Sequence, residues 1–393
     1  MVDQTMTTPT SSNHDKSASS AKLFGSSQIG FGKPALTGIK IADFSRVLAG
    51  PYATMMLADL GAEVIKIERP GVGDETRGWG PPFDAQGNAT YFQSVNRNKR
   101  NIGLDLNQRE DQERARDLIL ASDVVVENFG FGGMKKFGLD YATLKESKPK
   151  IIYCSITGFG NSEVGQNLPG YDLLIQGMSG LMSITGEADG APTKVGVALI
   201  DVVAGLHAVT GILAALRARD QFGIGQEVNI NLFSSALSAL VNQSGAFVSA
   251  GIISQRLGNS HPSIVPYGVF HASDRAFIVA VGNDQQFQRL ATKIGLTDEE
   301  RFKTNSSRVL HRIELETKLN AIFGTKTAAA WIGLLQEEQI PVGPINNISE
   351  AFDLAQALEL QAIVEIQGAQ SVANPIHLSE SAIQYLLPPP ELK

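Results

Sequence analysis

The chain has 393 residues, of which 43% are hydrophobic and 19% charged, a composition typical of a globular protein with a sizeable core. Its formal net charge of −7 argues against generic nucleic-acid binding, so any anion site must come from local clusters of Lys and Arg. Cys154 is the only cysteine, which excludes an internal disulfide and fits a reducing compartment. We expect no apolar run to reach the roughly 18–20 residues that span a bilayer, and we predict a cytoplasmic protein.

Residues 1–36 are rich in Ser, Thr and Gly and lack the apolar core of a signal peptide, so we predict a disordered tail. The next segments alternate between strands and helices. Residues 39–45 and 63–68 are typical strands, and the helical pattern between them stops at Gly61. This βαβ unit favours a parallel sheet. The alternation continues with strands at 101–106, 124–129 and 151–159 and with helices at 108–122 and 141–147.

The second half begins with a long apolar helix, predicted at 195–219, and a strand at 226–233. A helix at 234–251, a loop at 251–266 rich in Gly, Ser, Asn and Pro, a strand at 276–282 and a helix at 284–295 follow. A helix at 327–339 and the segment 340–346 are predicted to return to the first domain. The predicted fold class is α/β, with a large domain over 37–224, a smaller α/β domain over 225–325 and a return to the large domain over 326–393.

Several motifs are absent. The six histidines are scattered without metal-ligand spacing, and none lies between residues 15 and 206. The G-x-S-x-G elbow and the P-loop are missing, and no glycine cluster completes a dinucleotide fingerprint. We therefore predict no metal and no permanently bound cofactor.

Cationic residues follow the ends of successive predicted strands. Arg69 follows residues 63–68, the NRNKR run at 96–100 flanks the next strand, and Lys135 and Lys136 follow residues 124–129. Open α/β sheets bind ligands at such strand ends, and clustered cations there suit a polyphosphate. The alternative, that these are solvated surface charges, stays open for each residue taken singly.

Asp189 lies in SITGEADGAPTKVG, residues 183–196, between two hydrophobic elements. A carboxylate on a rigid, exposed turn could serve as a nucleophile toward an activated acyl group. Asp-Gly is also a common turn dipeptide, so a purely local role is the competing interpretation.

Long stretches of the chain resemble the class III CoA-transferase family, which groups formyl-CoA transferase, carnitine CoA-transferase and 2-methylacyl-CoA racemase. These stretches include LTGIKIADFSRVLAGPYATMMLADLGAEVIKIERPGVGDETRGWGPP, NRNKRNIGLDL, VVVENF, IIYCSITGFG, GYDLLIQGMSGLMSITGEADGAPTKVGVALIDVVAGL, GNSHPSIVPYGVF and PVGPINNI, and they run from residue 37 to about 375. The resemblance implies a Rossmann-like large domain, a small domain, and a homodimer of two interlocked rings.

The resemblance also implies site residues. It assigns Asp189 as the nucleophile, and it implies coenzyme A as a substrate rather than a resident cofactor. The implied CoA-contacting positions are Val47, Leu48, Ala49, Arg69, Leu104 to Asn107, Asn128, Phe129, Gly130, Lys136, Thr157, Gly158, Phe159 and Gly160.

Asp172 is a second acid, in the sequence GYD. In the racemases of this family the equivalent Asp acts with a His about thirty residues earlier, and no such His is present here. Because racemisation needs two acid/base groups, this reading is disfavoured. We expect Asp172 to shape the site or to cap a helix. A non-catalytic acyl-CoA-binding protein is the alternative from a different class.

The expected reaction moves CoA from an acyl-CoA to another carboxylic acid through an aspartyl anhydride and an aspartyl-CoA thioester. The loop 258–266 stands where formyl-CoA transferase has a glycine-rich gate. His261 in this loop binds the distal carboxylate of the acceptor or has a structural role. Three segments most resemble the family branch that uses succinyl-CoA and dicarboxylates. They are GNSHPSIVPYGVF, GNDQQF and PVGPINNI.

Overall fold

A computed structural model describes residues 28–29, 32–297 and 299–393 of the chain. Most of the predicted tail lies outside these residues. Two residues inside the predicted range, β1 (Gln28–Ile29), pair antiparallel with β13 (Ile383–Gln384). The described residues form two compact units, one of residues 28–29, 32–47, 51–125 and 352–393 and the other of residues 48–50, 126–297 and 299–351.

A six-stranded parallel sheet has the order β4-β3-β2-β5-β6-β7. The order runs outward from β2 in both directions, as in the doubly wound Rossmann arrangement, so the predicted fold class is confirmed for this sheet. The largely apolar sequences of β5 and β6 explain why β5 is buried throughout and β6 up to Ile156, since strands of a parallel sheet are covered on both faces. The strands are β2 (Lys40–Asp43), β3 (Glu63–Glu68), β4 (Lys99–Gly103), β5 (Val124–Glu127), β6 (Ile152–Thr157) and β7 (Glu227–Asn231).

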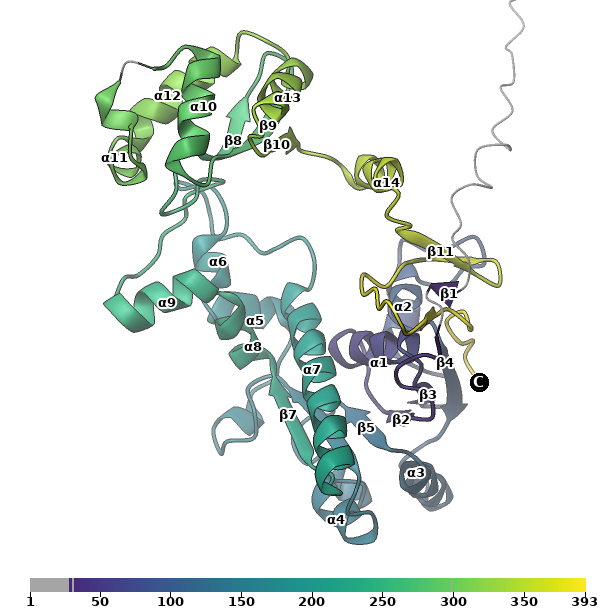
Figure 1. Ribbon diagram of the computed structural model, residues 1–393. Helices are drawn as coiled ribbons and strands as arrows, with labels where there is room; N and C mark the ends of the chain where they lie inside the picture. Colours follow the sequence, from purple (N-terminus) through teal and green to yellow (C-terminus); the bar gives the residue numbers. More distant parts are fainter. Residues whose placement is uncertain (1–27, 30–31, 298) are drawn as a thin grey trace, which may run out of the picture. The chain divides into compact units, whose positions relative to one another are not determined.

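Helices connect these strands, as the alternation predicts (Figure 1). The predicted helix over 234–251 is two helices, because Leu240 ends one and begins the next. The connecting helices are α1 (Ala49–Asp59), α2 (Thr90–Ser94), α3 (Arg109–Ala121), α4 (Tyr141–Ser147), α5 (Asp172–Met178), α6 (Leu181–Ile184), α7 (Leu199–Phe222), α8 (Leu232–Ala239) and α9 (Val241–Ala250).

Helix α7 has 24 residues and, among the described residues, is long and apolar enough to cross a membrane by length and composition alone. The expectation that no apolar run reaches this length is therefore wrong. The helix nevertheless packs against β6, β7, α5 and α8, and Ala204, Ala208, Ile212 and Ala215 are buried. Since these contacts bury one face of α7 within the protein, we assign it as a core helix.

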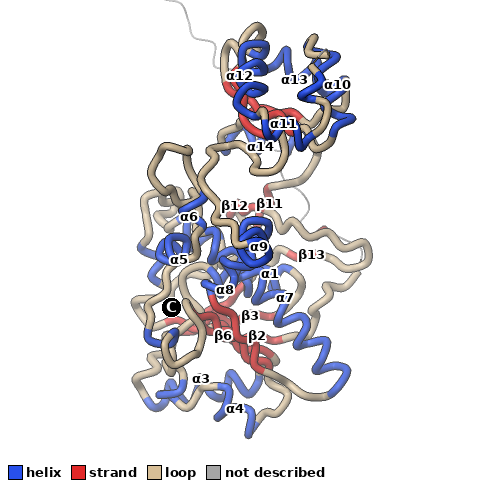
Figure 2. Tube along the Cα trace, turned by 90° about the vertical axis from the view of Figure 1, so that its left-hand side faces the viewer, coloured by secondary structure: helices blue, strands red, loops and turns tan. Residues whose placement is uncertain are grey.

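A second core lies within residues 265–342. Its sheet is antiparallel with the order β10-β9-β8, and four helices surround it (Figures 1 and 2). Trp331 and Phe323 pack at its centre, and the indole N–H of Trp331 donates to the carbonyl of Phe323. This core thus includes α13, which the sequence assigns to the returning segment. The elements are β8 (Tyr267–His271), β9 (Ala276–Ala280), α10 (Asp284–Ile294), α11 (Asn305–Leu310), α12 (Arg312–Phe323), α13 (Ala328–Glu337) and β10 (Val342–Pro344).

The chain then continues through α14 (Ile348–Ala357) into the hairpin of β11 (Ile363–Ile366) and β12 (Ala369–Val372). Apolar residues of this region, Val364, Ile366, Ile383 and Tyr385, form a cluster with Leu60. The carboxyl-terminal segment is therefore part of the same compact unit as β2, β3 and β4.

Candidate active site

In the first unit, the predicted CoA-contacting residues follow the carboxyl ends of β2, β3 and β4. Because these three strands are adjacent and parallel, their ends lie at one edge of the sheet. Val47 follows β2, and its backbone N–H donates to both carboxylate oxygens of Asp74. Arg69 follows β3 and is exposed. After β4, Leu104 is buried in the core, whereas Asn107 is exposed.

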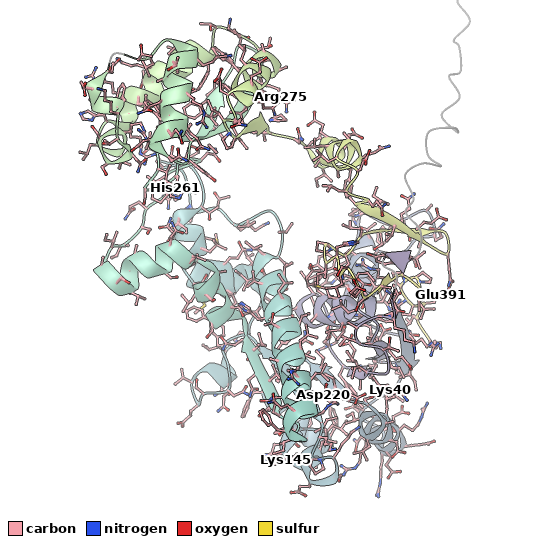
Figure 3. All side chains as sticks on the ribbon, viewed as in Figure 1. Lys40, Lys145, Asp220, His261, Arg275 and Glu391 are labelled. Carbon is pink, nitrogen blue, oxygen red and sulfur yellow. The ribbon has the colours of Figure 1, made fainter. Side chains whose placement is uncertain are left out.

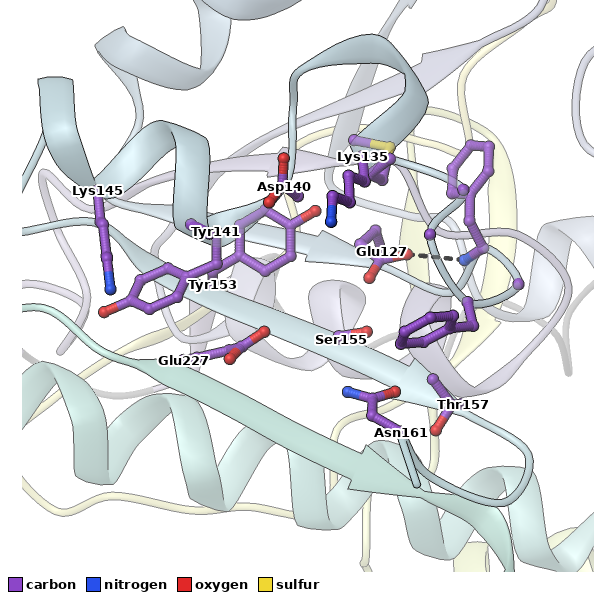
Figure 4. A pocket seen from close by; sticks show the side chains of 17 residues that line it. Glu127, Lys135, Asp140, Tyr141, Lys145, Tyr153, Ser155, Thr157, Asn161 and Glu227 are labelled. Carbon is purple, nitrogen blue, oxygen red and sulfur yellow. Dashed lines mark hydrogen bonds between the residues drawn. The ribbon is translucent and has the colours of Figure 1, made fainter. Parts of the chain in front are cut away.

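In the second unit, Asn128, Phe129 and Gly130 follow β5. Leu48 and Ala49, which belong to this unit, are buried at the start of α1. The turn after β5 lines a cavity of about 340 Å³ together with residues of β6, α4 and β7 (Figure 4). Of the predicted residues, the cavity brings together Phe129, Gly130 and Thr157. Its other lining residues are Glu127, Phe131, Gly132, Gly133, Met134, Lys135, Asp140, Tyr141, Ala142, Lys145, Tyr153, Ser155, Asn161 and Glu227.

Glu127 is the buried acid of this cavity. Burial raises its pKa to about 7, although hydrogen bonds with Ser155 and with the backbone N–H of Phe129 work in the opposite direction. Figure 4 shows the bond from Phe129 as a dashed line. The raised pKa leaves Glu127 partly protonated near neutral pH, so it can donate as well as accept a hydrogen bond.

Lys136 is exposed beside the ring of Phe137, and its neighbour Lys135 rather than Lys136 lines the cavity. After β6, the Thr157 hydroxyl accepts from the backbone N–H of Gly160, whose φ is +82°. The ring of Phe159 packs against Phe233, with centroids 5.6 Å apart. These contacts fix the turn after β6 at the carboxyl edge of the sheet.

Gly158 touches Gly170. A Cβ on Gly158 would lie 2.6 Å from the Cα of Gly170, two residues before Asp172. We expect Gly158→Ala to lower the free energy of unfolding by about 1–3 kcal/mol, because two backbones must separate. Denaturant unfolding measures this change. Gly130→Ala is the matched control, since its Cβ meets nothing within 4 Å, and an equal loss in the control would contradict the packing argument.

Asp172 is the first residue of α5, and its carboxylate is held at the amino end of α7. Oδ1 accepts from the backbone N–H groups of Ile200 at 2.7 Å and Asp201 at 3.2 Å, and Oδ2 accepts from the Gln176 amide at 2.5 Å. The prediction that Asp172 caps a helix is thus confirmed by these bonds. A carboxylate offers about four acceptor positions, so three bonds orient the group and leave one lone pair open. The helix dipole favours a negative charge at this place.

Asp201 brings a second carboxyl group to the same helix end. Burial, and to a lesser degree the nearby charge of Asp172, raises the pKa of Asp201 to about 7. Asp201 is therefore partly protonated near neutral pH, at the same helix end as the Asp172 carboxyl group. Neither the spacing nor the sequence around Asp201 distinguishes it from an ordinary acid in the first turn of a helix.

Asp189 is exposed in the turn of residues 187–190, which closes with the bond from the Gly190 N–H to the Glu187 carbonyl. Among the residues that the structure describes, its carboxylate makes no hydrogen bond or ion pair. The turn itself is held by Arg256, whose guanidinium donates to the carbonyls of Ser183, Glu187 and Gly190. The structure does not bring Asp189 and Asp172 into a shared hydrogen-bond network, and the role of Asp189 stays a prediction.

His261 lies in the loop before β8 (Figure 3). Its Nδ1 accepts from the backbone N–H of Ser263, and its ring packs 5.3 Å from the ring of Tyr267. Arg312 donates to the carbonyl of His261. These contacts hold the loop, and they leave Nε2 as the ring atom available for a substrate.

The sequence analysis did not identify Gln176, Asp201 or Arg256 as parts of a site. Gln176 stands four residues after Asp172 on one helix, a spacing at which side chains meet, so this pair was open to prediction. The contacts of Asp201 and Arg256 cross 28 or more positions of sequence and carry no local signal. Among the described residues, no three His, Cys, Asp or Glu side chains form a group that could hold a metal ion.

Comparison with known proteins identifies the family. Residues 36–393 match the model of "CoA-transferase family III". The chain is 43% identical over 378 residues to "Succinate--glutarate CoA-transferase" of Agrobacterium fabrum, covering 92% of this chain and 93% of that protein. It is 40% identical to the human "Succinyl-CoA:glutarate CoA-transferase", covering 91% of this chain and 83% of the human protein.

A solved structure agrees with the sequence matches. The crystal structure of a CAIB/BAIF family protein from Brucella suis is 41% identical, with a TM-score of 0.83, and the alignment covers 92% of this chain and 97% of that one. The predicted resemblance is therefore confirmed. The chain belongs to CoA-transferase family III and is an enzyme of that family.

Proposed function

We propose that this CoA-transferase moves CoA from succinyl-CoA to a second carboxylic acid, a dicarboxylate, by covalent catalysis on Asp172. The geometry of the Asp172 carboxylate carries the proposal, because two backbone N–H groups and the Gln176 amide hold it rigidly with one lone pair open. Asp189 remains the competing candidate nucleophile. Its exposed carboxylate lacks such orientation among the described residues, so we place Asp172 first.

The reaction needs no net proton transfer. The Asp172 carboxylate attacks the thioester carbonyl, and the carbon–sulfur bond breaks to give an aspartyl anhydride and the CoA thiolate. The thiolate then attacks the aspartyl carbonyl, which frees succinate and leaves an aspartyl-CoA thioester. The acceptor carboxylate attacks this thioester and forms a second anhydride with release of the thiolate. The thiolate finally attacks the acceptor acyl carbon, which yields the new acyl-CoA and restores Asp172.

Two regions support binding of the CoA moiety. The turns after β2 and β3 follow adjacent strands in one unit, the turns after β5 and β6 follow adjacent strands in the other, and doubly wound sheets bind ligands at such strand ends. Arg69 after β3 and Lys135 and Lys136 after β5 are exposed cations that suit a polyphosphate. The choice of succinyl-CoA and a dicarboxylate rests on the names of relatives at about 40% identity.

Intact-mass measurement after mixing with succinyl-CoA tests the mechanism. We expect a covalent adduct that hydroxylamine discharges to a hydroxamate on Asp172. Tryptic cleavage after Lys150 and Lys194 leaves both candidate aspartates in one peptide, so fragment ions must locate the label. A hydroxamate on Asp189 would reject Asp172, and the absence of any adduct would reject covalent catalysis. Discharge of the adduct by glutarate, mesaconate, citramalate or oxalate then identifies the acceptor.

A racemase is the second candidate, because Asp172 and Asp201 place two carboxyl groups at one helix end and burial raises the pKa of Asp201 to about 7. Racemisation exchanges the proton on the carbon next to the thioester. Incorporation of deuterium from solvent into a 2-methylacyl-CoA, without a carboxylic acid acceptor, would support it. A non-catalytic binding protein would show neither this exchange nor CoA transfer.

We also propose the interlocked homodimer and a cytoplasmic location. Apolar side chains that are exposed in the single chain, such as Phe247, Val248, Ile252 and Ile253 on and after α9, offer surface for a second copy. Light scattering during size-exclusion chromatography should give twice the mass of the 42.0 kDa chain. A monomer at micromolar concentration would contradict the dimer.

A further inference from the structure

Val47 has a strained backbone. Its φ is +68°, in the left-handed region that β-branched residues rarely adopt. A residue in this conformation is strained, so the surrounding structure must enforce it. The strained residue lies in the short segment between β2 and α1, where the chain leaves the sheet.

A buried ion pair holds this segment at two points. Asp74 accepts from the Val47 N–H at 3.3 and 3.2 Å, and it pairs with Lys66 at 2.9 Å. The Lys66 ammonium also donates to the carbonyl of Ser45 at 2.8 Å. Both charged side chains are 0% exposed. The ion pair therefore holds the Ser45–Val47 turn at both ends. Lys66 binds the carbonyl of Ser45, and Asp74 binds the N–H of Val47.

Asp74 cannot rotate away from this position. Its own N–H donates to Glu68 at 3.0 Å, and its Oδ1 accepts from the backbone N–H of Thr76 at 3.0 Å and from the Thr76 hydroxyl at 2.7 Å. Glu68 is fixed in turn by two bonds from Arg77. The ion pair is thus part of a rigid network inside one compact unit.

Two costly features meet at this turn. Burying an ion pair takes two charges out of water and is often no more stabilising than apolar packing. The strain of Val47 is a second cost at the same place. Costly local features such as a buried ion pair and a strained backbone are typical of functional sites, where the fold holds a conformation that the turn alone would not adopt.

We propose that Lys66 and Asp74 are positioning residues that hold the Ser45–Val47 turn in a strained conformation preformed for the CoA moiety of the substrate. This inference rests on the proposed function, in which the turn after β2 contacts CoA. A preformed turn has less conformational entropy to lose when the ligand binds. The enzyme that carries the strain before binding therefore has a higher affinity for CoA.

Val47→Gly tests the inference, because glycine adopts φ +68° without strain. We expect a higher melting temperature together with a rise of about fivefold in the Kd for free CoA and in the KM for succinyl-CoA, while kcat stays within twofold. Calorimetry gives the Kd and steady-state kinetics the KM. A lower melting temperature would overturn the strain, and an unchanged Kd would overturn its role in binding.

Two further variants separate the causes. Val47→Ala shortens the side chain but keeps the backbone penalty, so its Kd should rise less than that of Val47→Gly, and an equal or larger rise would assign the effect to a side-chain contact instead. Gln339→Gly is the matched control. Gln339 also has a positive φ, of +55°, but lies in the other compact unit, so its relief should leave the Kd for CoA unchanged.

Lys66→Met tests the ion pair itself, with circular dichroism to verify folding. A folded variant should show the same rise in Kd for CoA as Val47→Gly, and an unchanged Kd would contradict the positioning role. If Lys66→Met does not fold, the Kd values of Val47→Gly and Val47→Ala test the proposal without it. Wild-type enzyme that fails to bind CoA would reject the proposed function, while the melting temperature of Val47→Gly would still report the strain.

Discussion

Replacing Asp172 by asparagine is expected to lower kcat for CoA transfer at least about 10³-fold, because the amide cannot form the anhydride. Asparagine keeps a side-chain oxygen that accepts from the N–H groups of Ile200 and Asp201, so the amino end of α7 remains capped. The melting temperature should therefore change little. Steady-state transfer from succinyl-CoA to glutarate measures the rate, and calorimetry with free CoA should show retained binding.

Asp189→Asn is the matched control for this experiment. The Asp189 carboxylate is exposed and makes no bond within the described part of the chain, so its loss should change kcat less than about threefold. The opposite ranking, with Asp189→Asn inactive and Asp172→Asn active, would return the nucleophile to the turn of residues 187–190. CoA transfer by both variants would contradict covalent catalysis by either aspartate.

The second large effect concerns pH and Asp201. Its pKa lies near 7 in the folded enzyme, against an ordinary value of 3.8. Above pH 7 a second negative charge appears beside Asp172, where the thiolate and the acceptor carboxylate must approach as anions. We expect kcat/KM of the wild type to fall up to tenfold per pH unit above about 7, because only the enzyme with neutral Asp201 accepts these anions. Asp201→Asn, which mimics the neutral acid, should lack this decline.

Titration of Asp201 also lowers the free energy of unfolding as the pH rises. Because the folded state holds the proton on Asp201 more tightly than the unfolded state, the free energy of unfolding decreases as pH rises from about 4 to about 7. About three pKa units at 1.4 kcal/mol each set this cost at no more than about 4 kcal/mol. Asp201→Asn should thus raise the melting temperature at pH 8 and leave it nearly unchanged at pH 4.

Glu127→Gln is the control for the pH experiment. The pKa of Glu127 is also raised to about 7 by burial, so this variant should gain stability at alkaline pH as well. Glu127 lies in the cavity after β5 rather than beside Asp172, so in Glu127→Gln the decline of kcat/KM above pH 7 should persist. A decline that persists in Asp201→Asn, or disappears in Glu127→Gln, would contradict the role assigned to Asp201.

The large sheet was predictable because its strands carry their own signal. The range predicted for β3, 63–68, agrees with the structure, and β5 and β6 lie within their predicted ranges as uninterrupted apolar runs. The predicted strand at 101–106 extends too far, since β4 runs from Lys99 to Gly103 and the chain then turns. Helices α5 and α6 are not predicted from the sequence, although α4, which has seven residues like α5, is.

By itself the sequence determined the alternation of strands and helices, the family, and the two candidate aspartates. Local pattern suffices for these, since a strand, a turn or a motif is read from neighbouring residues. The tertiary structure supplies the contacts from which we propose Asp172 rather than Asp189 as the nucleophile. The bonds that orient Asp172 come from residues 28 and 29 positions later, and the raised pKa of Asp201 comes from burial at the same helix end. Such long-range contacts and burial exist only once α5 packs against α7, so no local pattern could reveal them.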